Sequence, residues 1–387
     1  MSSTAPARAA ATRSRSSYLD ILNDAWAQHT APRAADAPTV ISTFAGCGGS
    51  SLGYSMAGFR ELLAVEWDQN AVDTFRLNFP DVLVYHGDIA ALSVEDCLAR
   101  TGLQPGELDV FDGSPPCQGF STAGKRMMDD PRNQLFREYV RLLRGLRPKV
   151  FVMENVSGMV KGKMKLIFAE ILRELKASGY KVSARLMNAM YFNVPQSRER
   201  MIFIGVREDL AVEPSHPRGT RLVTTLRDAC GDIEYLVLGA HGQYAGRVVD
   251  AAREPSPTLC KTGLPSFVHG VFELGQAPPR ASELKQKRWK ETPRGGNHHE
   301  RFSLNRLDWN APAPTVQKTA TGSTGAMHPD EPRELYAGEL KRIGSYPDAY
   351  QFIGTWGQVL ARIGNSVPPL FMRSIAQHIR THILEAL

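Results

Sequence analysis

Residues 39–53 read Thr-Val-Ile-Ser-Thr-Phe-Ala-Gly-Cys-Gly-Gly-Ser-Ser-Leu-Gly, a β-branched apolar run that leads into a glycine-rich turn. Similar short runs alternate with helical stretches as far as about residue 206. This alternation is typical of an α/β fold in which crossover helices join the strands of a parallel sheet. We expect strands at 39–44, 62–66, 83–86, 108–112, 150–154 and 201–206, and helices at 132–144 and 166–175.

The turn after the first strand has the composition of a cofactor-binding loop. Glycines there allow backbone amides to approach a ligand closely. Gly46 and Gly48 match the start of a dinucleotide fingerprint, but Ser51 stands at its third glycine position. A nicotinamide-dependent dehydrogenase is therefore disfavoured.

Polar and aromatic side chains end the next two strands. Glu66 lies about twenty residues beyond Gly46, where an acid binds ribose hydroxyls, and Trp67 offers a face on which adenine can stack. Asp88 follows the third strand and could accept a hydrogen bond from an adenine amino group. Each residue could instead be a strand-end cap or a surface residue, but together they indicate an adenosine-containing cofactor.

Residues 113–121 read Gly-Ser-Pro-Pro-Cys-Gln-Gly-Phe-Ser and follow another apolar run. The two prolines fix φ and remove two backbone donors, so this loop holds Cys117 still at a strand end. A positioned thiol is a strong nucleophile near neutral pH, which makes Cys117 a candidate catalytic residue. The alternative is a buried structural cysteine.

Composition narrows the class of protein. The chain has 387 residues, is 42% hydrophobic and carries a net charge of +6, which fits a globular protein with a polyanionic partner. Its five scattered cysteines contain no Cys-x-x-Cys pair and indicate neither a disulfide framework nor a metal site. No apolar run suits a membrane span or a secretory signal, so we expect a cytoplasmic, nucleoid-associated protein.

The first seventeen residues contain Arg, Ser, Ala and Thr but no acid, and we expect residues 1–37 to form a flexible basic tail. An organellar transit peptide has a similar composition. After about residue 212, clusters of Pro, Gly, His and Arg replace the regular alternation, which indicates a second domain of irregular architecture.

Several short motifs occur together in a fixed order. The motifs are residues 44–49, Glu66-Trp67, Asp88, Pro115-Pro-Cys-Gln118, Glu154-Asn-Val156, Gln196-Ser-Arg-Glu-Arg200 and Gly364-Asn-Ser-Val-Pro-Pro369. As a set they resemble the DNA (cytosine-5) methyltransferase family, of the bacterial or phage modification type, from residue 39 to about 385.

The resemblance implies a specific chemistry. C5 of cytosine is too weak a nucleophile to attack S-adenosylmethionine directly, so the Cys117 thiolate adds to C6 first. Glu154 serves as the proton donor to N3, and Arg198 and Arg200 orient the base, with Arg200 the closer contact to O2. The alternative for these arginines is a structural salt bridge.

The resemblance also implies a Rossmann-like sheet that binds S-adenosylmethionine, with no metal. The residues expected at the cofactor are Phe44, Gly46, Gly48, Glu66, Trp67, Asp88, Ile89, Pro116, Asn365 and Val367. The catalytic domain would then be discontinuous, with residues 38–212 joined by residues from about 350 to 387. A smaller target-recognition domain would occupy residues from about 216 to 330.

The implied substrate is a specific sequence in double-stranded DNA, from which the cytosine is flipped out. Gln118 and Ser121 lie in the expected catalytic loop, where Ser121 could contact a phosphate. Residues 280–301 hold seven Lys or Arg against three Glu and could face the DNA, although an ordinary solvated surface would look similar. The DNA contacts expected in this stretch are Lys287, Arg288 and Arg294.

Two other functions stay open at this stage. One branch of the family methylates tRNA, although the Cys-Phe-Thr element usual in that branch is absent here. A catalytically silent DNA-binding regulator would keep the fold but has no need for Cys117, Glu154 and Arg200 together. We expect a monomer, for which a cognate restriction endonuclease is a candidate partner.

Overall fold

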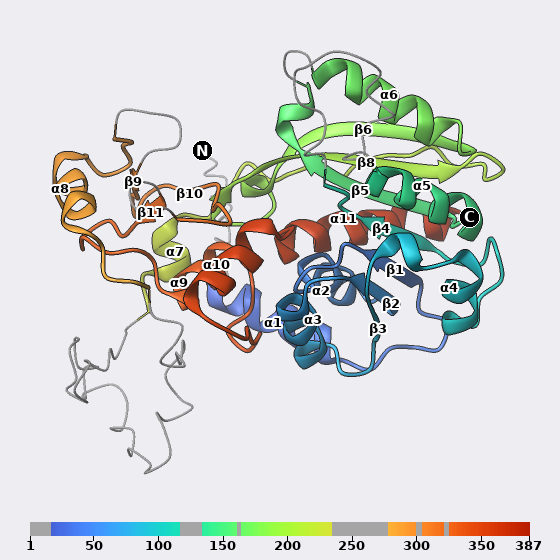
Figure 1. Ribbon diagram of the computed structural model, residues 1–387, viewed down its shortest axis with the longest axis horizontal. Helices are drawn as coiled ribbons and strands as arrows, with labels where there is room; N and C mark the ends of the chain where they lie inside the picture. The colour runs from blue at the N-terminus through green and yellow to red at the C-terminus, as the bar shows by residue number, and fades with distance from the viewer. Residues whose placement is uncertain (1–16, 117–133, 161–163, 234–277, 299–303, 321–324) are drawn as a thin grey trace, which may run out of the picture.

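The computed structural model of the chain describes residues 17–116, 134–160, 164–233, 278–298, 304–320 and 325–387. Within these residues a seven-stranded sheet has the strand order β3-β2-β1-β4-β5-β8-β6 (Figure 1). The strands of this sheet are β1 (Thr39–Thr43), β2 (Arg60–Glu66), β3 (Leu83–His86), β4 (Val110–Gly113), β5 (Val150–Val156), β6 (Tyr180–Asn188) and β8 (Glu199–Arg207).

The expected α/β fold is confirmed, and all six expected strands occur with ends within two residues of those predicted. The expectation of a wholly parallel sheet is wrong at one strand, because β8 runs antiparallel to both β5 and β6. Strand β6 was not predicted. Only residues 189–198 separate it from β8, and so short a connection cannot hold the crossover helix that a parallel pair requires.

Side chains that alternate along the buried strands build two separate cores. Val40 faces one core and its neighbour Ile41 faces the other, as the pleat of a strand requires. The first core is covered by α2 (Gly49–Met56), α3 (Gln69–Asn78) and α11 (Pro369–His382). The second is covered by α4 (Val94–Thr101), α5 (Gln134–Leu146) and α6 (Met164–Lys176). The sheet is therefore the middle layer of three.

The expected flexible tail over residues 1–37 is wrong for Tyr18–Thr30, which form the helix α1. Ser17 and Asp20 make a capping box at its start, and Tyr18, Leu22 and Ala25 are buried along one stripe. The Tyr18 hydroxyl also donates to Arg342 O at 2.9 Å. The expectation of disorder came from the acid-free residues 1–17, whereas α1 carries acids and an apolar stripe that it buries. Residues 1–16 lie outside the described part.

Helices α2 and α11 pack closely across the first core, although more than three hundred residues separate them in the sequence. Gly53 permits the contact. A Cβ atom at this position would lie 2.5 Å from Met372 Cβ and 2.7 Å from the Arg373 backbone nitrogen. The C-terminal segment therefore lies directly beside the helix that follows the glycine-rich turn.

A smaller lobe, which we call the α8 lobe, lies at the far left of Figure 1. It contains α8 (Glu283–Glu291) and the parallel pair β9 (Leu304–Arg306) and β11 (Gly325–Met327). Its own core consists of Ala281, Trp289, Leu304 and Met327. The remaining elements between lobe and sheet are β7 (Gln196–Ser197), β10 (Ala313–Pro314), α7 (Leu226–Cys230), α9 (Ala337–Ile343) and α10 (Trp356–Asn365).

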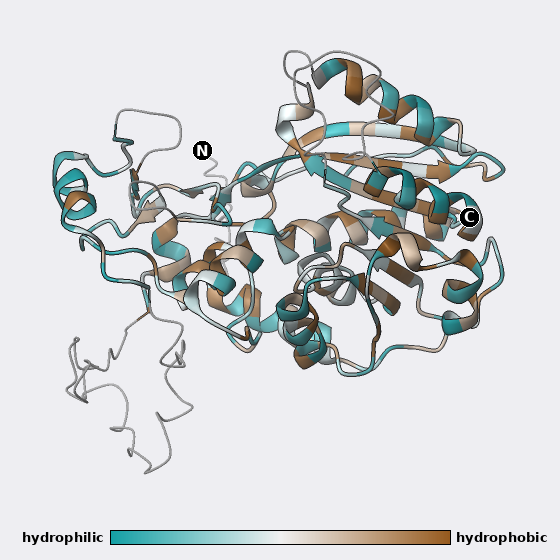
Figure 2. Cartoon of the chain, in the orientation of Figure 1, coloured by the Kyte–Doolittle hydropathy of each residue, from teal (hydrophilic) through white to brown (hydrophobic). Residues whose placement is uncertain are grey.

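Hydropathy follows this arrangement. Figure 2 shows hydrophobic residues concentrated in the strands of the large sheet, whereas α8 is largely hydrophilic. The helices in the described ranges include none with both the length and the apolar character that crossing a membrane requires.

Candidate active site

A cavity of about 500 Å³ lies at the carboxyl ends of β1, β2, β4 and β5, beside the turn between α10 and α11. This edge is the topological switch point of the sheet, since the chain order reverses between β1 and β4. The predicted residues that line the cavity are Phe44, Gly46, Glu66, Trp67, Pro116, Glu154, Arg198, Arg200, Asn365 and Val367. The structure therefore brings most of the predicted site together.

The turn between β1 and α2 has an unusual backbone. Phe44 has φ +54° and Gly46 has φ +57°, so a bulky residue occupies the left-handed region at the cavity wall. Gly48 has φ +90° and precedes the first turn of α2, and a Cβ there would lie 2.6 Å from the Phe79 ring. The structure therefore places Gly48 against the protein interior and not among the residues that line the cavity.

Glu66 is held by the backbone around it. Its carboxylate accepts hydrogen bonds from the amides of Gly46 (2.8 Å), Trp67 (3.0 Å) and Asp68 (2.9 Å). The acid at the end of β2 thus fixes the glycine-rich turn of β1 and faces the cavity with a defined orientation. Trp67 beside it is 78% exposed, which leaves its ring face free for stacking.

Besides Gly48, two further predicted cofactor residues lie apart from this cavity. Asp88 is exposed, and its carboxylate accepts from Ala90 N at 2.9 Å, which caps the short helix η1 (Ile89–Ala91). Ile89 is buried in the second core. Capping and core packing therefore account for both side chains, and neither is among the residues that line the cavity.

The proline pair leads β4 into the cavity. Asn155 Nδ2 donates to Pro115 O at 3.2 Å, which ties the end of β5 to the loop after β4. Pro116 lines the cavity and directly precedes Cys117 in the sequence. Cys117, Gln118 and Ser121 themselves lie outside the described residues.

Glu154 and Arg200 form an ion pair in the cavity wall. Arg200 Nε lies 2.7 Å from Glu154 Oε1, and the two side chains are only 13% and 11% exposed. The antiparallel pairing of β5 with β8 causes this meeting, because β8 begins where β5 ends and Val156 is opposite Arg200. One acid and one cation, both little exposed, therefore lie in the wall of the cavity that Pro116 also lines.

Arg198 differs from Arg200 in its contacts. It is 1% exposed, and its guanidinium donates to Val316 O at 3.2 Å and to Gly364 O at 2.8 Å. Burial, and then the neighbouring Arg200 charge, lower the pKa of Arg198 to about 9. We expected this side chain to orient a substrate base, but these hydrogen bonds instead join three backbone segments around the cavity.

One acid in the cavity wall was not predicted from the sequence. Asp112 is 3% exposed and accepts hydrogen bonds from Ser50 Oγ at 2.6 Å and from Tyr54 Oη at 3.2 Å. The pKa of Asp112 is raised to about 7, mainly by burial; the hydrogen bonds from the two hydroxyls lower it and the charge of Glu154 raises it. The sequence offered one signal for this residue, since Asp112 is an acid near the end of the otherwise apolar strand β4.

Three further charged residues at the cavity were not predicted either. Arg362 lines the cavity, and its Nη1 lies 3.0 Å from Oδ1 of Asp68, which links α10 to the start of α3. Lys318 reaches the cavity from the segment after β10. In the part of the chain that the structure describes, no group of three or more His, Cys, Asp or Glu is arranged to hold a metal ion.

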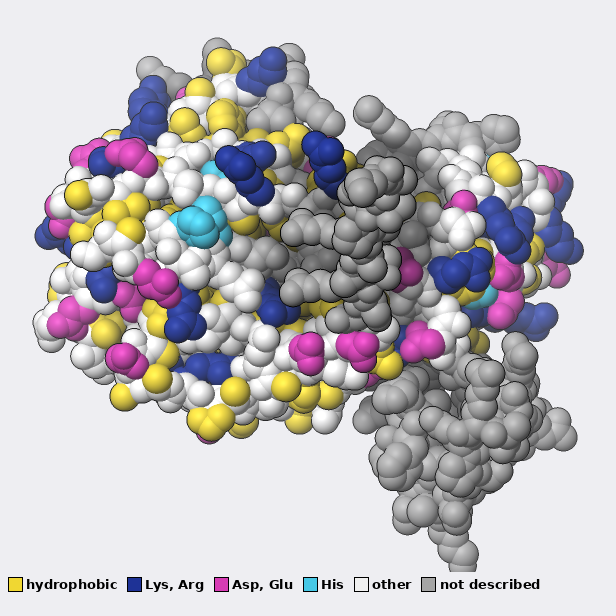
Figure 3. Space-filling view, turned by 180° about the vertical axis from the view of Figure 1, so that it is seen from behind, with side chains coloured by type: hydrophobic (Ala, Val, Ile, Leu, Met, Phe, Trp, Pro, Cys, Tyr) yellow, Lys and Arg dark blue, Asp and Glu magenta, His cyan; other side chains and the backbone are white. Residues whose placement is uncertain are grey.

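The predicted DNA contacts lie on the α8 lobe, where Lys and Arg side chains are visible on the face shown in Figure 3. Lys287 is 74% exposed, with Glu291 at 4.0 Å, and Arg288 is half-buried. Arg294 pairs with Asp330. Trp289 instead belongs to the core of the lobe, since its ring nitrogen donates to His328 O at 2.8 Å.

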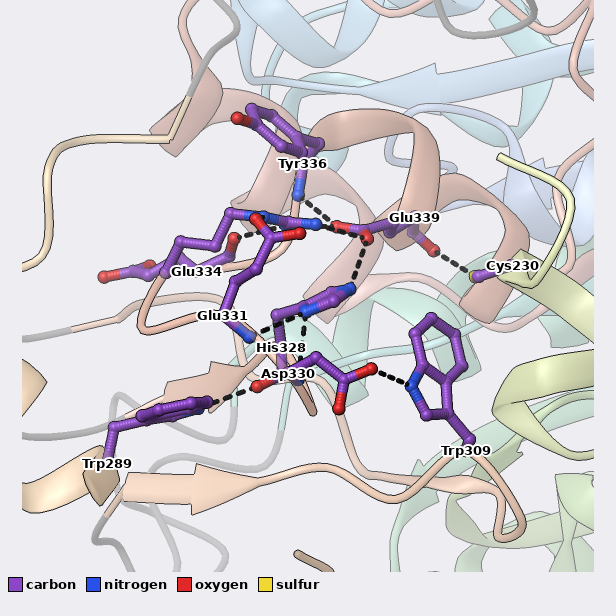
Figure 4. A network of polar contacts seen from close by, with 10 residues as sticks. Cys230, Trp289, Trp309, His328, Asp330, Glu331, Glu334, Tyr336 and Glu339 are labelled. Atoms are coloured by element: carbon purple, nitrogen blue, oxygen red, sulfur yellow. Dashed lines mark hydrogen bonds and ion pairs between the residues drawn. The ribbon is translucent and has the colours of Figure 1, made fainter. Parts of the chain in front are cut away.

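A polar network joins the α8 lobe to α9 (Figure 4). His328 Nδ1 accepts from the amides of Asp330 and Glu331, both at 3.2 Å, so Nε2 carries the proton and faces Glu339 Oε1 at 3.7 Å. Glu339 also accepts from Arg333 at 2.8 and 3.1 Å. This network therefore connects the α8 lobe to α9, which in turn packs against α10.

Comparison with known proteins decides the family. The family model of the C-5 cytosine-specific DNA methylases matches residues 38–381. The chain belongs to this family. Two relatives are similar over most of their length. Type II methyltransferase M1.HphI of Haemophilus parahaemolyticus is 34% identical over 347 residues, which cover 88% of this chain and 86% of that protein. M.DdeI of Desulfomicrobium norvegicum is 32% identical over 372 residues, or 88% of each chain.

Solved structures agree with this C5 methyltransferase fold. A DNA modification methyltransferase encoded within a prophage (E. coli) superposes with a TM-score of 0.67 at 26% identity, covering 90% of this chain and all of that one. Spodoptera frugiperda DNMT2 gives a TM-score of 0.59 at 18% identity, covering 89% and 99%, which supports the fold alone. The protein is thus a C-5 cytosine-specific DNA methyltransferase by family, and its fold agrees with that assignment.

Proposed function

We propose that this methyltransferase transfers a methyl group from S-adenosylmethionine to C5 of a flipped-out cytosine within a specific double-stranded DNA sequence. The main support is that one cavity holds the Glu66 turn, the Glu154–Arg200 pair and the proline that precedes Cys117. A cofactor site and a base site would thus share one sheet edge, which methyl transfer requires.

The cavity suits an adenosine-containing cofactor that supplies the methyl group when bound. Glu66 is oriented by three amides and has carboxylate lone pairs left for ribose hydroxyls. Trp67 exposes its ring to an adenine, and Phe44 and Val367 supply apolar walls. Asn365 contributes from the α10–α11 turn.

The residues near Pro116 would act on the base. The Cys117 thiolate forms a bond to C6 while Glu154 holds a proton at N3, so the electron pair of the C5–C6 bond becomes available at C5. After C5 is methylated, a base removes the C5 proton and the bond from Cys117 to C6 breaks. Arg200, whose Nε lies 2.7 Å from Glu154 Oε1, would keep that carboxyl in place and contact the same base.

Arg198 is better suited to a positioning role. Its guanidinium fixes the segments at residues 316 and 364, and the second of these continues into Asn365 and Val367 of the cavity. We infer that Arg198 fixes the position of the cofactor side of the cavity relative to the base side. The DNA itself would lie against the α8 lobe, with Lys287, Arg288 and Arg294 near phosphates and Ser121 near the flipped nucleotide.

The domain division proposed from the sequence is compatible with this assignment, with a catalytic domain at 38–212 and about 350–387 and a recognition domain at about 216–330. The names of the Type II relatives favour a partnership with a cognate restriction endonuclease. We retain a monomer as the proposed state in solution.

The test uses DNA and tRNA as competing substrates, followed by bisulfite sequencing of DNA from cells that express the protein. Label in duplex DNA at one repeated sequence supports the proposal, and label only in tRNA contradicts it. DNA with a fluorine at C5 of the target cytosine should trap a covalent complex with wild-type protein but not with Cys117→Ala. If wild type forms no adduct in the presence of cofactor, a silent DNA-binding regulator becomes the better assignment.

A further inference from the structure

One buried acid in the cavity has no part in the chemistry proposed above. Asp112 has two hydrogen-bond donors, Ser50 and Tyr54, and both are neutral hydroxyls of α2. No ion pair to its carboxylate is found among the residues that the structure describes, although Arg198, Arg200 and Arg362 line the same cavity. A buried carboxylate without a cationic partner is costly, so the cavity favours a ligand that brings a positive charge.

The sheet order shows where that charge should lie. Glu66 ends β2 and Glu154 lies near the end of β5, and the strands between them are β1 and β4. Asp112 of β4 is paired with Ser42 of β1 on one side and with Val152 of β5 on the other. Since neighbouring strands are about 4.8 Å apart, β4 lies two strand spacings from β2 and one from β5. Asp112 therefore lies between the strand of the acid proposed for ribose and the strand of the acid proposed for the base, and it is nearer to the second.

The covalent structure of the cofactor matches this order. In S-adenosylmethionine the sulfur is bonded to C5′ of the ribose and also carries the methyl group that must reach the base. With its ribose at Glu66 and its methyl group directed toward Glu154, the molecule would have its sulfur near the ends of the two strands between them, β1 and β4. This sulfur is positively charged in the substrate and neutral in the product, S-adenosylhomocysteine.

We propose that Asp112 is a specificity-determining residue that recognises the sulfonium charge and thereby favours S-adenosylmethionine over S-adenosylhomocysteine. The inference rests on the proposed function, since it requires this cofactor in this cavity. It gives the enzyme a means to release its product, because methyl transfer removes the charge that Asp112 attracts.

The preference should depend on pH. The pKa of Asp112 is about 7, and the titratable groups that face it are Tyr54 of α2, Glu61 of β2, Tyr139 of α5 and Glu154 of β5. Only ionised Asp112 attracts the sulfonium, so the preference is present above pH 7 and declines as the pH falls below it. The α-ammonium group occurs in both ligands and cancels from the ratio of their affinities.

The test is isothermal titration calorimetry of the full chain with S-adenosylmethionine and with S-adenosylhomocysteine at pH 8. Asp112→Asn keeps the shape and can still bond to both hydroxyls. We expect it to raise the Kd of S-adenosylmethionine about tenfold and to change that of S-adenosylhomocysteine less than about twofold. Retained binding of S-adenosylhomocysteine also shows that the variant is folded.

Glu61→Gln is the matched control. Glu61 is a half-buried acid that likewise accepts from a serine of α2, with Ser51 Oγ at 2.8 Å, but it is not among the residues that line the cavity. Glu61 faces Asp112, but its loss removes only a repulsion, and at pH 8 Asp112 is already above its pKa of about 7. The Glu61→Gln variant should therefore keep the preference for S-adenosylmethionine. An equal loss of affinity for both ligands in Asp112→Asn would assign the acid to the shared ammonium group and overturn the inference. Failure of wild type to bind either ligand would contradict the proposed cofactor itself.

A second variant decides the matter if Asp112→Asn does not fold. Ser50→Ala removes a donor to the carboxylate, which raises the pKa of Asp112. The preference for S-adenosylmethionine should therefore be lost at pH 7 and recovered at pH 9. A ratio of affinities that does not change with pH in this variant would count against a role for the Asp112 charge.

Discussion

At the scale of single residues, the groups proposed for the chemistry were easier to predict from the sequence than the contacts that support them. Glu154 and Arg200 were predicted together, and they form an ion pair at 2.7 Å. Arg198 was assigned to the base as well, but its guanidinium binds carbonyls 118 and 166 residues away in the sequence. No local sequence pattern predicts these carbonyl partners, because only the packing of distant segments brings them to Arg198.

The role of Glu154 leads to a prediction at the same scale. Glu154→Gln removes the group that shares a proton with N3, and we expect methyl transfer to fall by about 10²-fold or more while DNA binding persists. Single-turnover methylation and a filter-binding assay measure the two effects. Glu199→Gln serves as the control, because Glu199 is an exposed acid at the start of β8 that lies outside the cavity. Methylation by Glu154→Gln at the rate of this control would exclude the assigned role.

At the scale of helices and strands, periodicity predicted what lies in the sheet but not how the ends of the chain pack on it. The six predicted strands alternate between two cores, and that alternation is visible in the sequence. Strand β6 was not predicted because much of it is only half-buried, so its sequence shows little alternation of apolar and polar residues. The α2–α11 contact depends on the absence of a side chain at Gly53, and a glycine in a helix does not by itself reveal what it approaches.

This close approach can be tested with a single methyl group. In Gly53→Ala the new Cβ would meet the Met372 side chain and the backbone of α11, so we expect a loss of about 1–3 kcal/mol in the free energy of unfolding. Gly357→Ala is the matched control, since the nearest atom to its Cβ is 4.0 Å away, and it should leave stability unchanged or slightly increased. Urea denaturation followed by circular dichroism compares them, and equal stability of the two variants would contradict the packing argument.

At the scale of the whole molecule, the large sheet supplies the cavity and a smaller lobe is attached beside it. The α8 lobe is fastened to α9 by the network around His328 and Glu339 (Figure 4). The basic composition of residues 280–301 indicated a surface, and Lys287 is indeed exposed there, but Trp289 within the same stretch is core. Composition alone cannot separate the two, because a short helix presents both faces within nine residues.

The cations of α8 should contribute to DNA affinity without selecting a sequence. Lys287→Ala combined with Arg288→Ala removes two charges from α8, and we expect weaker binding to all duplexes. The slope of log K against log salt should be smaller by about 0.9 for each phosphate that the variant no longer binds. Fluorescence anisotropy from low to moderate salt measures this slope. Lys176→Ala is the control, because Lys176 is exposed at the end of α6. That helix runs back from the carboxyl ends of the strands, so its last turn lies at the opposite edge of the sheet from the cavity. An unchanged slope in the double variant would place the DNA elsewhere on the molecule.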